Sequence, residues 1–112
     1  MRFASVLLFF AFFVCCKSPY FTPVHADADK MTGRWQSYSF DQLNTGFHLY
    51  VNKCAGCHTL YKPALYTEEQ WTKVIPEMAQ RALITEEEQQ DILRYILSMR
   101  EPSVLQTKPT KL

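Results

Sequence analysis

Two cysteines and a histidine in the middle of the chain, Cys54-Ala55-Gly56-Cys57-His58, constrain its folding more than any other stretch. Two thiols three residues apart, with a histidine directly after the second, form the attachment signature of a c-type haem. Each thiol adds across one vinyl group of the porphyrin, and a turn of backbone brings both thiols to one edge of the ring. His58 then reaches the iron from one face. The motif predicts one covalently attached haem c.

Two other interpretations of the thiol pair were weighed against haem. A Cys-X-X-Cys pair in an exported protein can form a redox disulfide, but no strand–helix–strand pattern of the thioredoxin type surrounds this one. A structural zinc ion needs four nitrogen or sulfur ligands. The other cysteines are Cys15 and Cys16, and the remaining histidines are His25 and His48, all distant from the motif. Haem is therefore preferred.

The N-terminus has the form of an export signal. Met1-Arg2 precedes an uncharged, mostly apolar run over 3–16, which is typical of a secretory signal and too short to span a bilayer comfortably. Small residues predict cleavage after Ala26, giving a signal peptide over 1–26, with Ala28 as a second site. The alternatives are a lipoprotein signal over 1–15 that leaves an acylated Cys16, and an uncleaved anchor. The sequence predicts a periplasmic protein, in contact with the membrane only through a lipid at Cys16.

Three capping boxes predict three short helices. In each box a hydroxyl residue is followed three positions later by Gln or Glu, and the two side chains satisfy N–H groups that a helix start leaves free. Apolar residues then recur at helical spacing. The boxes begin at Ser39, Thr67 and Thr85, and the first helix is expected to reach about Asn52. No stretch of alternating apolar and polar residues is long enough to predict a strand. The predicted fold class is therefore all-α, with three main helices around the haem.

The chain is expected to form one domain, because its 112 residues match the usual size of one. The helical part spans 39–101. Pro19, Pro23 and Gly33 mark 17–38 as a linker, of which 27–38 remains after the predicted cleavage, and prolines mark 102–112 as a flexible tail. Lys and Arg number 12 against 11 Asp and Glu. This balance argues against a nucleic-acid binder, which would need a basic surface.

The surroundings of the haem motif resemble the class I c-type cytochromes, which are small monohaem electron carriers. That family has a glycine eight positions and an aromatic residue four positions before the first haem cysteine. In that family the C-terminal helix crosses the N-terminal helix at this glycine. It contacts that helix through an apolar residue and an aromatic residue three positions later. These positions hold Gly46, Tyr50, Ile92 and Tyr95. The resemblance covers about 39–100 and implies a small cytochrome c-like fold.

The residues agree with such a crossing. A glycine inside a helix costs about 1 kcal/mol relative to alanine, and close approach of a second helix would give Gly46 a packing reason. The alternative is that Gly46 only weakens its helix.

The resemblance also implies a methionine as the second axial ligand of the iron. Met78 is the one methionine between the haem motif and the last helix. Pro76 is expected to kink or end the second helix by removing a hydrogen bond to Thr72, which would turn the Met78 thioether towards the iron. Simple core packing is the other explanation for Met78. The alternative distal ligands are Met99, His25 and His48, or an open site.

Two further residues fit the resemblance in part. Pro63 begins a Pro-X-Leu sequence similar to one in the family, where the proline carbonyl accepts the Nδ1–H of the proximal histidine. The loop from His58 to Pro63 is much shorter than is usual there, and an ordinary loop proline is the alternative. Trp71 is expected to pack against the porphyrin or the core.

Together these patterns predict an electron carrier and not an enzyme, without catalytic residues. Cys54 and Cys57 would attach the haem, and His58 and Met78 would ligate its iron. Donor and acceptor proteins are implied but not identified. The compact arrangement also resembles haem subunits and domains of periplasmic dehydrogenases. A dedicated haem subunit is therefore one alternative, and a haem-based sensor with an open iron is another. The chain is expected to be a monomer or a subunit of a larger complex.

Overall fold

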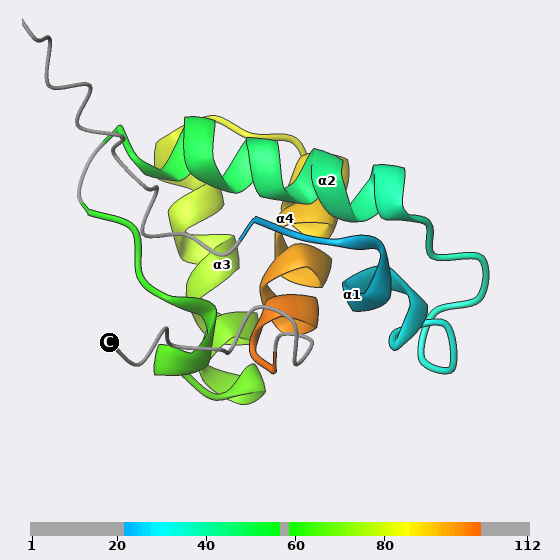
Figure 1. Cartoon of the computed structure of the whole chain (residues 1–112). Coiled ribbons are helices and arrows are strands. Elements are labelled where there is room, and N and C mark those ends of the chain that lie inside the picture. The colour runs from blue at the N-terminus through cyan, green and yellow to red at the C-terminus, as the bar shows by residue number, and fades with distance from the viewer. Residues whose placement is uncertain (1–21, 57–58, 102–112) are drawn as a thin grey trace, which may run out of the picture.

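The structure, a computed structural model, describes residues 22–56 and 59–101, and these residues form helices and loops without a strand (Figure 1). The all-α prediction is therefore confirmed. The helices are α1 (His25–Asp29), α2 (Phe40–Leu49), α3 (Glu68–Ala82) and α4 (Glu86–Met99). A π-helical turn, Tyr50–Cys54, continues α2, and a short 3-10 turn, Pro63–Leu65, precedes α3. Among the described helices, none has the length and apolar character that a membrane span needs.

All three predicted capping boxes are present. The hydroxyls of Ser39, Thr67 and Thr85 each accept the backbone N–H three residues later at 3.2 Å. In return, the side chains of Gln42, Gln70 and Glu88 accept the N–H of the capping residue. These reciprocal bonds satisfy donors that a helix cannot pair internally. They explain why α2, α3 and α4 begin where the sequence predicts.

The crossing of α2 and α4 forms the centre of the molecule, and Gly46 lies at it. A Cβ atom at position 46 would lie 2.2 Å from the backbone oxygen of Asp91 and 2.7 Å from Cβ of Tyr95. No side chain fits in that space, so only glycine allows the two backbones to approach this closely. The predicted packing reason for Gly46, with Ile92 and Tyr95 on the opposite helix, is confirmed.

The core extends from this crossing towards α3. Tyr95 is fully buried and its ring lies 5.5 Å from that of Phe47 and 5.7 Å from that of Tyr50. Tyr50 in turn meets Trp71 of α3 edge to face, at 6.5 Å between ring centroids. The aromatic side chains therefore connect the helix crossing to α3. The buried aliphatic and sulfur-containing side chains of this core are Leu43, Leu60, Ile75, Ala79, Ile92, Ile96 and Met99.

The segment expected to be a linker over 27–38 is packed against the helices instead. It contains most of α1, whose Asp27 and Ala28 are buried, and it ends at the buried Tyr38. Pro19, Pro23 and Gly33 predicted a linker, but both prolines precede α1 and Gly33 follows it, so they do not prevent a short helix whose polar groups are paired locally. The predicted signal peptide and C-terminal tail lie mostly or wholly in 1–21 and 102–112, outside the described residues, and stay predictions.

The sequence predicted that Pro76 kinks or ends the second main helix. In the structure this helix, α3, does not end at Pro76 but continues to Ala82. The proline removes one hydrogen bond to the carbonyl of Thr72. Both residues are exposed, so water can satisfy that carbonyl. The Thr67 capping box fixes one end of α3 and Leu83, in the left-handed conformation, closes the other. With both ends of α3 fixed in this way, the helix continues past Pro76.

Candidate functional site

An apolar cavity of about 280 Å³ lies between the π-helical turn, the loop that follows the haem motif, and α3. Cys54 and Met78 both line it, so the first haem-attachment thiol and the predicted distal ligand border one space. Cys57 and His58 lie outside the described residues. The remaining lining residues are mostly aromatic or aliphatic: Tyr50, Leu60, Tyr61, Tyr66, Trp71, Val74, Ile75 and Ala82, with Lys53 and Arg81 as the charged members.

The π-helical turn positions Cys54. The sequence predicted that the first helix reaches about Asn52, and the π-helical turn continues it to Cys54 with more residues per turn. Single π-turns inside or at the end of α-helices are frequent at functional sites. Buried Tyr50 begins the turn, and its hydroxyl donates to the carbonyl oxygen of Tyr61 at 2.5 Å. This bond ties the residues before the haem motif to those after it.

Trp71 and Pro63 form a second fixed point of the loop. Trp71 is buried, and its indole Nε1–H donates to the Pro63 carbonyl at 2.8 Å. The family resemblance implied that this carbonyl accepts a hydrogen bond from His58. The bond from Trp71 was not predicted. The available signal was the indole itself, because a buried Trp N–H needs an acceptor. A carbonyl oxygen has two lone pairs, so the predicted bond from His58 stays open as a second one. The expected packing of Trp71 in the core is confirmed.

Met78 owes its place at the cavity to helical spacing. It follows Trp71 and Ile75 by seven and three residues, and all three line the cavity from one face of α3. The proline break invoked from the sequence is not needed to turn the thioether inward. Met78 is half-buried, as a side chain at the border of a cavity is expected to be.

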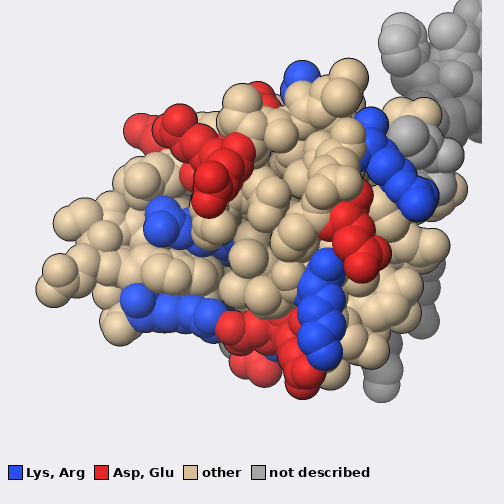
Figure 2. All heavy atoms as spheres, turned by 180° about the vertical axis from the view of Figure 1, so that it is seen from behind, with Lys and Arg blue, Asp and Glu red and all other residues tan. Residues whose placement is uncertain are grey.

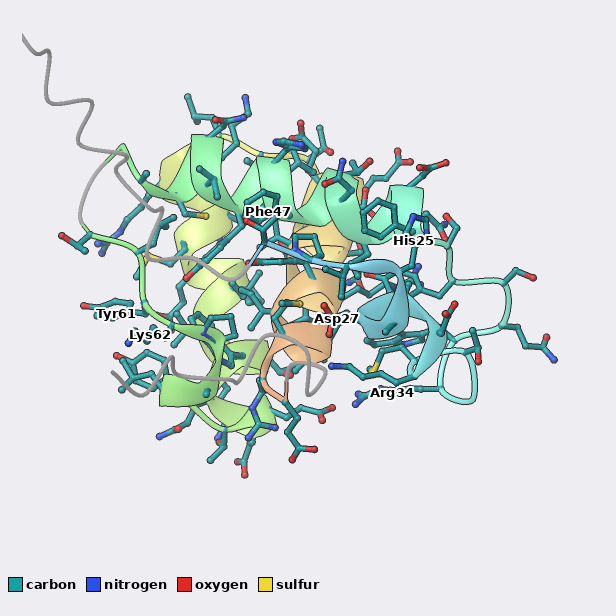
Figure 3. The ribbon with its side chains drawn as sticks, in the orientation of Figure 1. His25, Asp27, Arg34, Phe47, Tyr61 and Lys62 are labelled. Atoms are coloured by element: carbon teal, nitrogen blue, oxygen red, sulfur yellow. The ribbon has the colours of Figure 1, made fainter. Side chains whose placement is uncertain are left out.

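The other candidate ligands lie elsewhere. Met99 is fully buried in the core on α4. His25 stacks on Phe40 at 4.1 Å, on the side of the molecule opposite to Tyr61 (Figure 3). His48 is exposed on α2 and contacts Phe47. None of the three is among the residues that line the cavity. Within the described residues no three His, Cys, Asp or Glu side chains gather as a metal site would require.

The charges of the cavity have one sign. Lys53 and Arg81 line it, and no acidic side chain among the described residues does. An apolar space bordered by two cations is suited to a largely apolar ligand that carries anionic groups. The porphyrin of haem c, with its two carboxylates, is such a ligand. The thiol of Cys54 and the thioether of Met78 add the donor types that a c-type haem uses, so the residues present fit this group.

Elsewhere the surface carries both signs close together. In the view from behind, acidic and basic side chains alternate over the helices (Figure 2). Arg34, from the loop after α1, pairs with Glu68 at the start of α3, which lowers the pKa of that carboxyl and raises the pKa of the guanidinium. Lys73 pairs with Glu69 at 2.8 Å. Such exposed pairs contribute little to stability.

The helical fold, with Cys54 of the predicted attachment motif and the thioether of Met78 bordering one apolar cavity, is compatible with a c-type cytochrome, a class of electron-transfer proteins with covalently bound haem c. The family model of the dihaem cytochromes c matches residues 50–110, more than half of the chain, and the chain belongs to this family. The match covers the cavity, α3 and α4. No curated protein and no solved structure matches the chain.

The family corrects part of the expectation from the sequence. It supports a c-type cytochrome but not the monohaem class I type that the positions of Gly46 and Tyr95 resemble. The match begins at Tyr50, so the glycine at the helix crossing lies outside it. The family description names two haems, whereas the 112 residues contain one Cys-X-X-Cys-His motif.

Proposed function

We propose that this chain binds one haem c at Cys54 and Cys57 and transfers single electrons between two other redox proteins in the periplasm. The single attachment motif supports a count of one. The observation that carries the proposal is that Cys54 and Met78 line the same apolar cavity. The bound haem would supply an iron that alternates between the ferric and ferrous states.

The residues of this chain would have separate roles. Cys54 and Cys57 attach the porphyrin, and His58 and Met78 ligate the iron. A thioether ligand is soft, stabilises ferrous iron and raises the reduction potential. Trp71 and its aromatic neighbours exclude water from the cavity, which lowers the local dielectric constant. Lys53 and Arg81 place positive charge where the carboxylates of the porphyrin need partners.

The surface around the cavity suits brief contacts with partners. Tyr61, which lines the cavity, is 43% exposed. Away from the cavity, the face seen in Figure 2 carries interspersed charges, which give little long-range steering. Small, weak and short-lived interfaces are typical of redox encounters. The match to a family of cytochromes c supports a carrier over an enzyme.

The distal ligand is the sharpest test. The holoprotein should give a low-spin reduced spectrum and, when oxidised, the weak far-red band of methionine bound to ferric iron. Met78→Ala should abolish that band and produce a high-spin iron that binds carbon monoxide. Met99→Ala is the matched control, because it removes a methionine from the core and should keep the band. An unchanged spectrum of Met78→Ala would refute the ligand and favour the sensor with an open iron.

The family match favours one second candidate, a haem subunit that works beside another haem-bearing protein. Affinity purification of the tagged holoprotein from a host that makes its natural neighbours distinguishes the two. A second haem-staining polypeptide in fixed ratio would support the subunit. A protein that elutes alone with one haem per chain would support the diffusing carrier.

A further inference from the structure

The residues just before the predicted cleavage site are packed into the fold. Pro23 is buried, although it precedes α1. The ring of His25 stacks on Phe40, the first residue of α2, at 4.1 Å. Ala28 is 2% exposed and belongs to the core. Val24 and Ala26 are partly buried, whereas His25 stays exposed despite its stack. These contacts on both sides of the predicted cut are those of a segment that packs against the helices.

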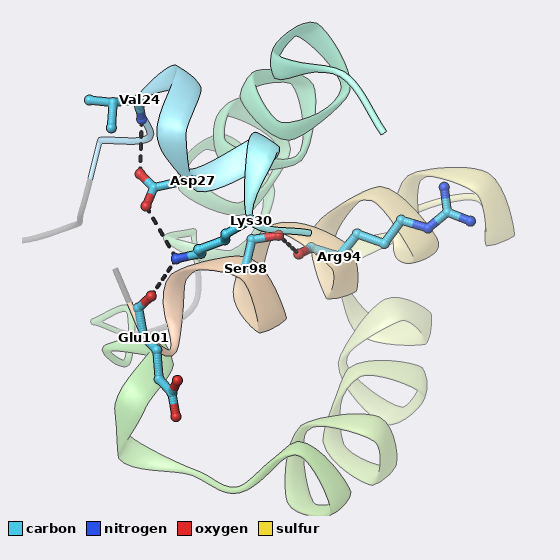
Figure 4. A network of polar contacts seen from close by, with 6 residues as sticks. All are labelled: Val24, Asp27, Lys30, Arg94, Ser98 and Glu101. Carbon is cyan, nitrogen blue, oxygen red and sulfur yellow. Dashed lines mark hydrogen bonds and ion pairs between the residues drawn. The ribbon is translucent and has the colours of Figure 1, made fainter. Parts of the chain in front are cut away.

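A buried carboxylate fixes the same segment to α4. Asp27 is fully buried, and its two oxygens accept the backbone N–H of Val24 at 3.0 Å and Nζ of Lys30 at 3.2 Å (Figure 4). Nζ of Lys30 also donates to the carbonyl oxygen of Glu101, beyond the end of α4. This network, residues 23–30 bound to Glu101, is called the N-terminal clamp below. It joins parts of the chain that are 71 positions apart.

Cleavage at either predicted site would break the clamp. A cut after Ala26 removes the N–H of Val24, one of the donors to the buried carboxylate of Asp27. Loss of a hydrogen-bond donor to a buried carboxylate is destabilising. A cut after Ala28 removes Asp27 altogether and leaves Lys30 without its carboxylate. Both cuts also remove His25 from its stack on Phe40.

We infer that the N-terminal clamp is part of the mature protein, so that processing of the exported chain occurs before Pro23. This inference rests on the export included in the proposed function. The inferred signal peptide is shorter than the 1–26 predicted from the sequence. Both cleavage without a lipid and cleavage with acylation at Cys16 are compatible with it.

The test is the intact mass and N-terminal sequence of the haem-loaded protein from the periplasmic or membrane fraction of an exporting host. A first residue between 16 and 23, with or without a lipid, supports the inference. A first residue at Asp27 or Asp29 overturns it. A chain that remains in the cytoplasm with Met1 and no haem would overturn the proposed export. Its location distinguishes this result from an exported chain that is cut at a different residue.

A pair of variants in the full chain tests the clamp independently of processing. Asp27→Asn keeps the shape of the side chain and removes the charge that faces Lys30. We expect its unfolding equilibrium constant to rise about tenfold, as for loss of a charged hydrogen bond. Asp29→Asn makes the same change at an exposed position of α1 and should leave the constant unchanged. Equal stability of the two variants would overturn the clamp.

Discussion

Replacing Gly46 with alanine should separate the two helices that form the centre of the molecule. The added Cβ would lie 2.2 Å from the Asp91 carbonyl oxygen, where ordinary contact begins at 3.4 Å. The obstacle is backbone, so no side-chain rotation relieves it. The helices must then move apart by about 1 Å, a shift that forfeits part of the dispersion contacts of the buried Tyr95 and its neighbours.

Two opposing terms decide the size of the effect. Alanine has a higher helix propensity than glycine, by about 1 kcal/mol. Overpacking in a closed core costs typically about 1–3 kcal/mol and sometimes more. Because the clash is with backbone, the upper end of that range applies, and we expect a net loss of about 2 kcal/mol. For a domain of this size that corresponds to a lower Tm by about 8–16 °C.

The assay is urea unfolding of the haem-loaded protein, followed by far-ultraviolet circular dichroism. The matched control is Gly33→Ala, because a Cβ at Gly33 would meet nothing within 4 Å and its backbone is not left-handed. This control should be neutral or stabilised by about 0.4–1 kcal/mol. A Gly46→Ala protein as stable as the wild type would refute the close crossing.

Three further predictions concern the end of α3, the loop and the buried phenols. Leu83→Gly should raise the free energy of unfolding by about 0.5–1 kcal/mol, because Leu83 has a φ of 54° and glycine adopts that conformation without strain. Trp71→Phe should lower it by about 1–3 kcal/mol in thermal unfolding, since the buried Pro63 carbonyl loses its donor. Burial raises the pKa of Tyr38 to about 12 and also raises the pKa of Tyr95. The unfolded chain therefore ionises these phenols first, and stability measured by circular dichroism should fall as the pH rises above 10, by up to about 1.4 kcal/mol per pH unit and tyrosine.

Each of these has a control and a contradicting result. Leu83→Ala keeps the strained backbone, so a stabilisation as large as that of glycine would assign the gain to the side chain. Trp35→Phe makes the same change at a partly buried ring that keeps its contact with Tyr38, so a smaller loss is expected; an equal loss there would contradict the role of the Pro63 bond. Tyr95→Phe should reduce the alkaline slope, and an unchanged slope would place the titration elsewhere.

The helix starts were predictable because their signals are local. A capping box requires a hydroxyl and a carboxyl or amide three residues later, and both partners are visible in the sequence at Ser39, Thr67 and Thr85. The glycine at the crossing was predictable for a different reason. A glycine within a helix needs an explanation, and the resemblance to class I c-type cytochromes, in which a glycine at this place lies at a helix crossing, implied one.

Two expectations differ from the structure because they depended on how a segment packs. Composition predicted a linker at 27–38, but it cannot show that Asp27 becomes buried or that Lys30 reaches the carbonyl oxygen of Glu101, 71 positions away. The expected end of α3 at Pro76 relied on a lost hydrogen bond, whose cost is small because the carbonyl of Thr72 is exposed. Burial and exposure are decided by the packing of the whole chain.

The sequence by itself determined the haem-attachment motif, the helical class and the three main helix starts, because each depends on residues within one turn of one another. Three features depend on the tertiary structure. Cys54 and Met78 line one cavity, and Trp71 donates a hydrogen bond to the Pro63 carbonyl. Lys30, in the segment 23–30, donates to the carbonyl oxygen of Glu101 beyond α4. These contacts join different elements, up to 71 positions apart in the chain, and so depend on how those elements pack. At the centre of that packing, α2 and α4 approach so closely that only glycine fits at position 46.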